Sequence, residues 1–143
     1  GDQRWRVPRA EVTRTVNEAF DKYDVAELAA DPWGWRSEIE SWQQTHGERR
    51  VIEWNTAHAQ RMAPATDRLF QAVKEDAVSH DGNKDLAAHI SHCVAKSTSL
   101  GDLVAKDRKN SPRKIDAAVC AIVALDRAAF YGKKKRRGRV AAF

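Results

Sequence analysis

The spacing of apolar positions predicts helices along most of the chain. Apolar residues recur every three or four positions, as on one face of a helix, in five stretches. These stretches are 8–23, 33–46, 64–78, 85–94 and 111–127. The residues that we expect to face inward in the first three are Val12, Val16, Ala19, Phe20 and Tyr23, then Trp35, Ile39, Trp42 and His46, then Leu69, Phe70, Val73 and Ala77.

The stretch 111–127 carries the strongest helix signals. Ser111 is suited to cap the free amides of a helix, and Pro112 suits the first helical position. From Ala117 to Leu125 the only polar side chain is the thiol of Cys120. A helix that is apolar all round is normally buried. Asp116 therefore lies where this helix enters a core, and its charge needs a metal ion, a basic neighbour or the helix dipole to compensate it.

Strand signals are fewer and shorter. The β-branched and aromatic stretch 50–54 predicts a strand, and 103–106 predicts a second short one. Propensity alone favours helix for 25–30, a stretch that ends at Asp31-Pro32. We expect a loop over 55–62 and turns at 79–83 and 97–101. Helices alternating with strands predict an α/β fold. So few strands leave edges unpaired, which suggests that further strands come from another part of a longer protein or from another chain.

Composition narrows the class of protein. The length of 143 residues fits one domain or a piece of one. No run of 18 apolar residues exists, so we expect no membrane span. Two distant cysteines, Cys93 and Cys120, suggest reduced thiols in the cytoplasm. The net charge is +5, and six basic residues fall between 133 and 139. We therefore predict a basic tail over 132–143, which either touches DNA or an acidic partner or is a solvated, disordered end.

Two acidic residues stand out by position. Asp116 is one, and Asp31 is the other, because it would lie at the carboxyl end of a strand if 25–30 is extended. Two such carboxylates suit Mg²⁺ or Mn²⁺, and paired ions can activate water against a phosphodiester. The alternative is structural: Asp31 caps the following helix, and Asp116 pairs with Arg113 or Lys114.

Five short motifs in order then resemble a known family. They are Asp31-Pro32-Trp33, Arg61-Met62-Ala63-Pro64-Ala65, His80-Asp81-Gly82-Asn83, Lys106, and Lys114-Ile115-Asp116-Ala117-Ala118-Val119. Together they resemble the large terminase subunit of tailed bacteriophages, in the C-terminal part of its nuclease domain, over residues 8 to 131. The resemblance implies a partial ribonuclease H-like fold that lacks its first strands, with domain bounds of 1–131 and 132–143. It also implies that 25–30 is a strand.

The function that the resemblance implies is metal-dependent cutting of concatemeric viral DNA during packaging. Asp31 and Asp116 match two of the family's three acidic positions and would be the catalytic Mg²⁺ or Mn²⁺ ligands. The first acid has no counterpart, so whether this stretch of chain cuts DNA alone stays open. The motor domain's phosphate loop is also absent from the sequence. The implied partners are double-stranded DNA, the terminase small subunit and the portal protein, in the cytoplasm of a bacterial host.

Basic residues crowd the approach to Asp116. Those that we expect near DNA, unless they form a merely solvated loop, are Lys106, Arg108, Lys109, Arg113 and Lys114. His89 and His92 are three residues apart on a predicted helix. Without a third ligand a zinc site is not expected. The family that the chain resembles often carries a His at the place of His89 and an Asn at that of His92, which implies a structural or DNA-proximal role. The rival functions are a non-catalytic DNA- or portal-binding module and an inactive prophage remnant.

Overall fold

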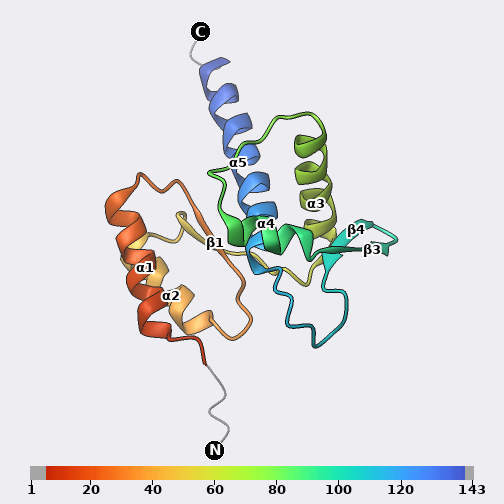
Figure 1. Ribbon diagram of the computed structural model, residues 1–143. Coiled ribbons are helices and arrows are strands. Elements are labelled where there is room, and N and C mark those ends of the chain that lie inside the picture. The colour runs from red at the N-terminus through yellow and green to blue at the C-terminus, as the bar shows by residue number, and fades with distance from the viewer. Residues whose placement is uncertain (1–5, 141–143) are drawn as a thin grey trace, which may run out of the picture. The chain divides into compact units, whose positions relative to one another are not determined.

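The computed structural model describes the backbone of residues 6–140 and the side chains of residues 6–133. The chain divides after Asn55 into two compact units. Figure 1 traces the elements in order. They are α1 (Arg9–Lys22), β1 (Leu28–Ala30), α2 (Arg36–His46), β2 (Val51–Glu53), α3 (Ala59–Lys74), α4 (Lys84–Ser91), β3 (Val94–Thr98), β4 (Gly101–Ala105) and α5 (Asp116–Val140). Within the described range, no helix is both long and apolar enough to cross a bilayer.

The first unit is a parallel strand pair with two helices. β1 and β2 pair in parallel with Leu28 opposite Val51 and Ala30 opposite Glu53, and α2 provides the crossover that a parallel pair requires. Its core is formed by Ile39, Trp42 and Val51. Partly buried side chains of α1 and β1 pack against that core: Val12, Val16, Phe20, Leu28 and Ala30.

Most expectations for the first unit are confirmed. The stretch 25–30 contains strand β1, so the helix that propensity favours is wrong there: pairing with β2 outweighs a weak local preference. Both predicted helices form, although α2 begins at Arg36 and not at Trp33. Tyr23 does not face inward, because it follows α1 in extended backbone and is 60% exposed.

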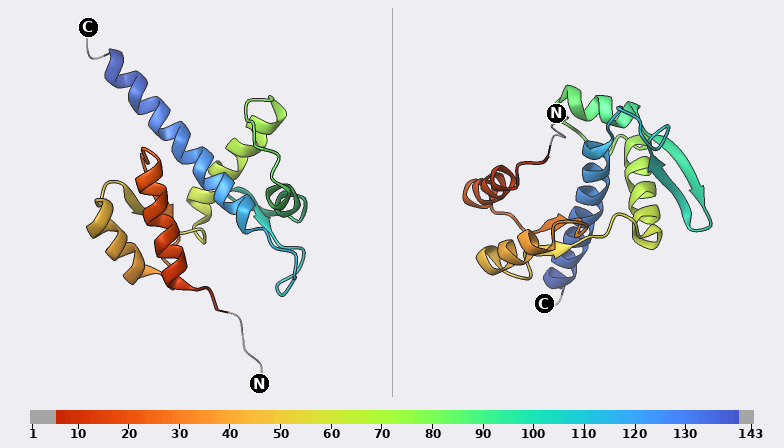
Figure 2. Two further views of the ribbon diagram at one scale, coloured as in Figure 1. Left: turned by 60° about the vertical axis from the view of Figure 1, so that its left-hand side comes forward. Right: turned by 90° about the horizontal axis from the view of Figure 1, so that it is seen from below.

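The second unit has α5 at its centre. α5 packs against α3 and α4, and α3 also packs against β4 of the antiparallel hairpin β3–β4 (Figure 2). The buried side chains of this unit come mainly from α3 and the first half of α5. They are Met62, Ala63, Ala65, Ile115, Ala118, Ile122 and Val123. Small residues on α3 leave little space between the packed elements: a Cβ added at Gly101 would lie 3.3 Å from the Cβ of Ala63.

Several expectations for α3, α4 and the hairpin are wrong. α3 begins at Ala59, so part of the predicted loop 55–62 is helical, and Pro64 lies inside the helix. Phe70 and Val73 are 60% and 58% exposed, because Met62, Ala63 and Ala65 form the buried face instead. α4 ends at Ser91, and Val94–Thr98 is strand β3, which the helical pattern concealed. Gly101, at φ +122°, follows the tight turn between β3 and β4.

The long helix differs from its prediction at both ends. α5 begins at Asp116, so Pro112 is not its first residue and Ser111 is not its cap. The backbone continues as helix through Val140, beyond the predicted end at residue 127. The basic side chains from Lys134 onward lie outside the described residues, so the role predicted for the basic tail stays a prediction. Over the described residues, the strands form the two-stranded sheets β1–β2 and β3–β4 in a small mixed α/β fold, where one small sheet was expected.

Candidate functional site

Asp31 lies directly after β1, at the carboxyl end of the parallel strand pair. The backbone amide of Trp54, which follows β2, donates to the carbonyl of Ala30. This bond extends the pairing of the two strands to the residue before Asp31. Asp31 Oδ1 accepts from the backbone amide of Trp33 at 2.9 Å and closes a short turn. The N-cap of α2 is Trp35, so the prediction that Asp31 caps that helix is wrong.

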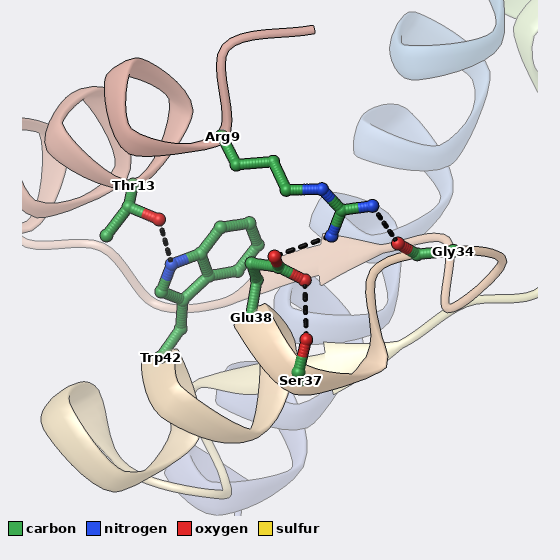
Figure 3. Close-up of polar contacts among 6 residues, drawn as sticks. All are labelled: Arg9, Thr13, Gly34, Ser37, Glu38 and Trp42. Carbon is green, nitrogen blue, oxygen red and sulfur yellow. Dashed lines mark hydrogen bonds and ion pairs between the residues drawn. The ribbon is translucent and has the colours of Figure 1, made fainter. Parts of the chain in front are cut away.

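Arg9 braces the turn that follows Asp31 (Figure 3). Its guanidinium pairs with the carboxylate of Glu38, donates to the backbone oxygen of Gly34 at 2.6 Å, and lies 4.7 Å from the ring centre of Trp35. The hydrogen bond from Arg9 holds the pKa of Glu38 below its ordinary value. This brace joins α1 to the turn, and the sequence pattern did not reveal it.

Trp33 is the exposed aromatic residue of this turn. It is 89% exposed, whereas Trp42 and Trp54 are buried. Tryptophan is normally buried over most of its surface, so an indole held in solvent beside a candidate metal ligand is unusual. Because Asp31 fixes its backbone amide, the exposure of Trp33 belongs to a defined turn.

Asp116 is the first residue of α5, and it is exposed. The residues on either side of it pack inward: Ile115 is 8% exposed and Ala118 is 2% exposed. Cys120 is exposed as a residue, but partial desolvation of its thiol, followed by the negative charge of Asp116 one turn earlier, raises the pKa of Cys120. Asp116 therefore presents its carboxylate at the surface from a backbone that is anchored in the core.

Two histidines of α4 contact the start of α5. His89 Nδ1 accepts from the backbone amide of Ala117 at 2.9 Å, which satisfies one of the amides left unpaired at a helix start. His92 Nδ1 donates to the carbonyl of Lys114 at 2.8 Å. These bonds fit a structural role for His89, and its proximity to DNA stays a prediction.

The loop 106–115 between β4 and α5 presents the predicted basic residues. Asp107 accepts from the hydroxyl of Ser111 and from the amide of Arg108, and these bonds lower its pKa. Ser111 is buried, and its Oγ accepts from the amide of Arg113 at 3.2 Å, so it organises the loop. Lys106 is half-buried. The exposed cations of the loop are Arg108, Lys109, Arg113 and Lys114.

The chemistry of the two candidate acids suits a hard divalent cation. Carboxylate oxygens are the donors that Mg²⁺ and Mn²⁺ prefer, and a ligating carboxylate commonly accepts a further hydrogen bond, as Asp31 does from Trp33. Among the residues with described side chains, no three His, Cys, Asp or Glu groups gather as a metal site. Asp31 belongs to the first unit and Asp116 to the second, so their convergence on one site stays a prediction.

Comparisons with known proteins bear on residues that span both units. The family model described as "Terminase large subunit, endonuclease domain" matches residues 10–131. The chain is similar to the Gene 13 protein of Mycobacterium phage D29, with 34% identity over 95% of the chain. It is also similar to the Gene 13 protein of Mycobacterium phage L5, with 33% identity over 94% of the chain.

The chain covers 25% of the length of each of these two relatives. No solved structure matches it. The family match covers both candidate acids, the paired histidines and the basic loop. This chain therefore belongs to the endonuclease-domain family of the terminase large subunits.

Proposed function

We propose that this chain forms part of a divalent-metal-dependent endonuclease that cuts concatemeric viral DNA during phage packaging. The observation that carries the proposal is the family match over residues 10–131. The geometry of each unit supports it. One unit places Asp31 at the carboxyl end of parallel strands, and the other places Asp116 at an exposed helix start after a basic loop.

A partial ribonuclease H-like fold is part of this proposal. The parallel pair β1–β2 with its α2 crossover is the supporting feature, because it leaves sheet edges that further strands can extend. Those strands would come from the rest of a longer protein. The relatives, of which the chain covers a quarter, are long enough to contain them.

In the proposed reaction, Asp31 and Asp116 would be the residues that hold Mg²⁺ or Mn²⁺. When bound, such ions supply an activated water and stabilise the charge that develops on the leaving oxygen. Lys106 and the exposed cations of the loop 106–115 neutralise phosphates on either side of the cleaved bond. Contacts of this kind carry no base information, so cleavage has little sequence preference.

The proposed partners are double-stranded DNA, the terminase small subunit and the portal protein, within the cytoplasm of a bacterial host. A rival function is a non-catalytic module that binds DNA or the portal through its cations. The observation that favours this rival is that the two candidate acids belong to separate units of the chain. An inactive prophage remnant would keep the fold and lose metal binding.

Cleavage of supercoiled plasmid with Mn²⁺ tests the proposal. When the chain is joined to the strands that would precede it in a longer protein, we expect nicking, and a loss of about a hundredfold or more in Asp31→Asn and Asp116→Asn, because each removes a ligand charge. Asp21→Asn is the matched control, since Asp21 is an exposed acid of α1. Metal-dependent cleavage that survives Asp116→Asn would contradict the assignment.

DNA binding separates the rivals. Under conditions without cleavage, Arg108→Ala and Lys109→Ala should each lower affinity and reduce the slope of log affinity against log salt by about one. In the longer protein that includes the preceding strands, binding without any Mn²⁺-dependent cleavage would favour the non-catalytic module. Binding and cleavage both absent there would favour the remnant.

A further inference from the structure

Two imidazoles hold the backbone on either side of Asp116, one through a ring nitrogen that accepts a hydrogen bond and the other through a ring nitrogen that donates one. Ala117 offers an N–H to His89 Nδ1, so that nitrogen must be the acceptor and, in the neutral ring, the proton lies on Nε2. Lys114 offers a carbonyl to His92 Nδ1, so that nitrogen must carry a proton. The two side chains, three residues apart, thus use the same ring atom in opposite roles.

The two bonds bracket a very short segment. Lys114 precedes Asp116 by two residues and Ala117 follows it directly, so one bond holds the chain before the carboxylate and the other holds it after. Between them, Ile115 is buried, and its carbonyl accepts the first intrahelical bond of α5 from Val119 at 3.1 Å. The backbone of Asp116 therefore has little freedom, although its side chain is exposed.

The element that presents these imidazoles is itself well capped. The side chain of Asn83 accepts from the amides of Asp85 and Leu86, which satisfies the start of α4. His92 is the C-cap of α4, and its ring lies 6.3 Å from that of His89, centre to centre. α4 packs against α5 and lies across its first turns (Figure 1). The bracket therefore rests on a short, fixed helix.

We propose that His89 and His92 are positioning residues for the carboxylate of Asp116: together they set the backbone from Lys114 to Ala117 so that Asp116 binds a divalent cation in one orientation. This inference rests on the proposed function for its metal, but not for its geometry. A ligand held in advance loses little conformational freedom on binding, so removing its support weakens metal affinity.

Substitutions of His89 and His92 by asparagine or leucine separate the effect of the hydrogen bond from the effect of side-chain volume. The δ atoms of asparagine lie near the position of imidazole Nδ1, so Oδ1 in His89→Asn can still accept from Ala117, and Nδ2 in His92→Asn can still donate to Lys114. Leucine at either position keeps a branched side chain and removes the hydrogen bond. Each site thus has a conservative variant and a matched variant without the bond.

Two measurements on the full chain test the proposal. The first is Mn²⁺ affinity, followed by the electron paramagnetic resonance of the free ion. The second is exchange of the Ala117 amide, followed by NMR without metal. We expect His89→Leu and His92→Leu to weaken Mn²⁺ binding about tenfold or more and the asparagine variants to stay within about twofold. The Ala117 amide should exchange faster in His89→Leu and remain protected in His89→Asn.

Each outcome decides either the positioning role of the two histidines or the binding of a metal at Asp116. Folded leucine variants with unchanged Mn²⁺ affinity and unchanged exchange would overturn the positioning role. Leucine variants that fail to fold leave the decision to the asparagine pair: weak Mn²⁺ binding there, with Ala117 still protected, would also overturn it. If the unaltered chain binds no Mn²⁺, the metal site fails, while the exchange comparison still decides whether the bracket exists.

Discussion

The two units support their candidate acids with different kinds of interaction. In the first, Asp31 lies in a turn held from α1 by the charged side chain of Arg9, which is half exposed. In the second, Asp116 lies at a helix start held from α4 by two imidazoles bonded to backbone atoms. A charge pair near the surface is screened by salt, whereas a hydrogen bond that satisfies a helix-end amide depends much less on salt.

The comparison shows which conditions should disturb the backbone around each aspartate. The turn after Asp31 depends on a pair of charges, so low pH and high salt should loosen it first. The start of α5 depends on tautomers and on the burial of Ile115 and Ala118, so substitutions should disturb it more than ionic strength does. The predictions below test this contrast, from the largest expected effect to the smallest.

The cores of the two units should be equally sensitive to the shortening of a buried side chain. Ile39 and Ile122 are each 1% exposed, so Ile39→Ala and Ile122→Ala should each cost about 2–5 kcal/mol of unfolding free energy by leaving a cavity. Urea denaturation measures the loss. Ile52→Ala is the control, because Ile52 is only partly buried. A loss below about 1 kcal/mol in either core variant would show that the packing around that residue is wrong.

The charge of Asp116 should be detectable through Cys120. Since Asp116 contributes to the raised pKa of the Cys120 thiol, Asp116→Asn should bring that pKa back toward its ordinary value and speed alkylation near neutral pH, by less than about tenfold. Mass spectrometry of labelled peptides measures the rate at each cysteine.

Cys93 is the internal control for this experiment. Burial alone raises the pKa of Cys93, so its labelling rate should not change in Asp116→Asn. Mg²⁺ bound at Asp116 should lower the pKa of Cys120, as the Asp116→Asn substitution does. Equal acceleration at both cysteines would instead indicate general loosening of the fold.

The brace in the first unit should weaken in acid. The pKa of Glu38 is lower in the folded chain than its ordinary value of 4.5. Its contribution to stability is therefore fully present above the unfolded pKa and is lost as the pH falls through the folded value. Glu38→Gln should remove this part of the pH dependence, measured by urea denaturation at neutral pH and at about pH 3.

A second ion pair offers the matched control for that variant. Arg14 and Glu18 are four residues apart on α1, at 3.8 Å, with side chains about 70% exposed. Glu18→Gln should leave the pH dependence nearly unchanged, because a pair so exposed contributes little. If Glu38→Gln and Glu18→Gln behave alike, the Arg9 brace is no stronger than an ordinary surface pair.

Trp33 should matter least for folding. Because it is 89% exposed, Trp33→Ala should change the unfolding free energy by no more than about 0.5 kcal/mol. Trp42→Ala, in contrast, removes a buried ring and its bond from Nε1 to Thr13, and should cost about 3–5 kcal/mol. Denaturation followed by circular dichroism avoids the loss of fluorescence. A large cost at Trp33 would mean that its indole is packed in solution.

The local spacing of apolar residues predicted where helices and strands occur better than it predicted which of their faces are buried. The helices α1, α2 and α5 and the strand β2 follow from apolar spacing and β-branched residues. Phe70 and Val73 show the limit, because periodicity identifies an apolar face without saying what covers it. Alanines and Met62 pack against the neighbouring elements instead, since small side chains let helices and hairpins approach closely.

The sequence by itself determined the family, because five motifs in order indicate it and the family match covers them. The site residues that the family implies stay a prediction. Only the tertiary structure decided how each acid is supported. Arg9 lies 25 residues from Gly34 and His89 lies 28 from Ala117, and contacts between positions so distant in sequence leave no periodic pattern. Packing of α1 and α4 against their neighbours creates these supports, and that packing follows from burial throughout each unit.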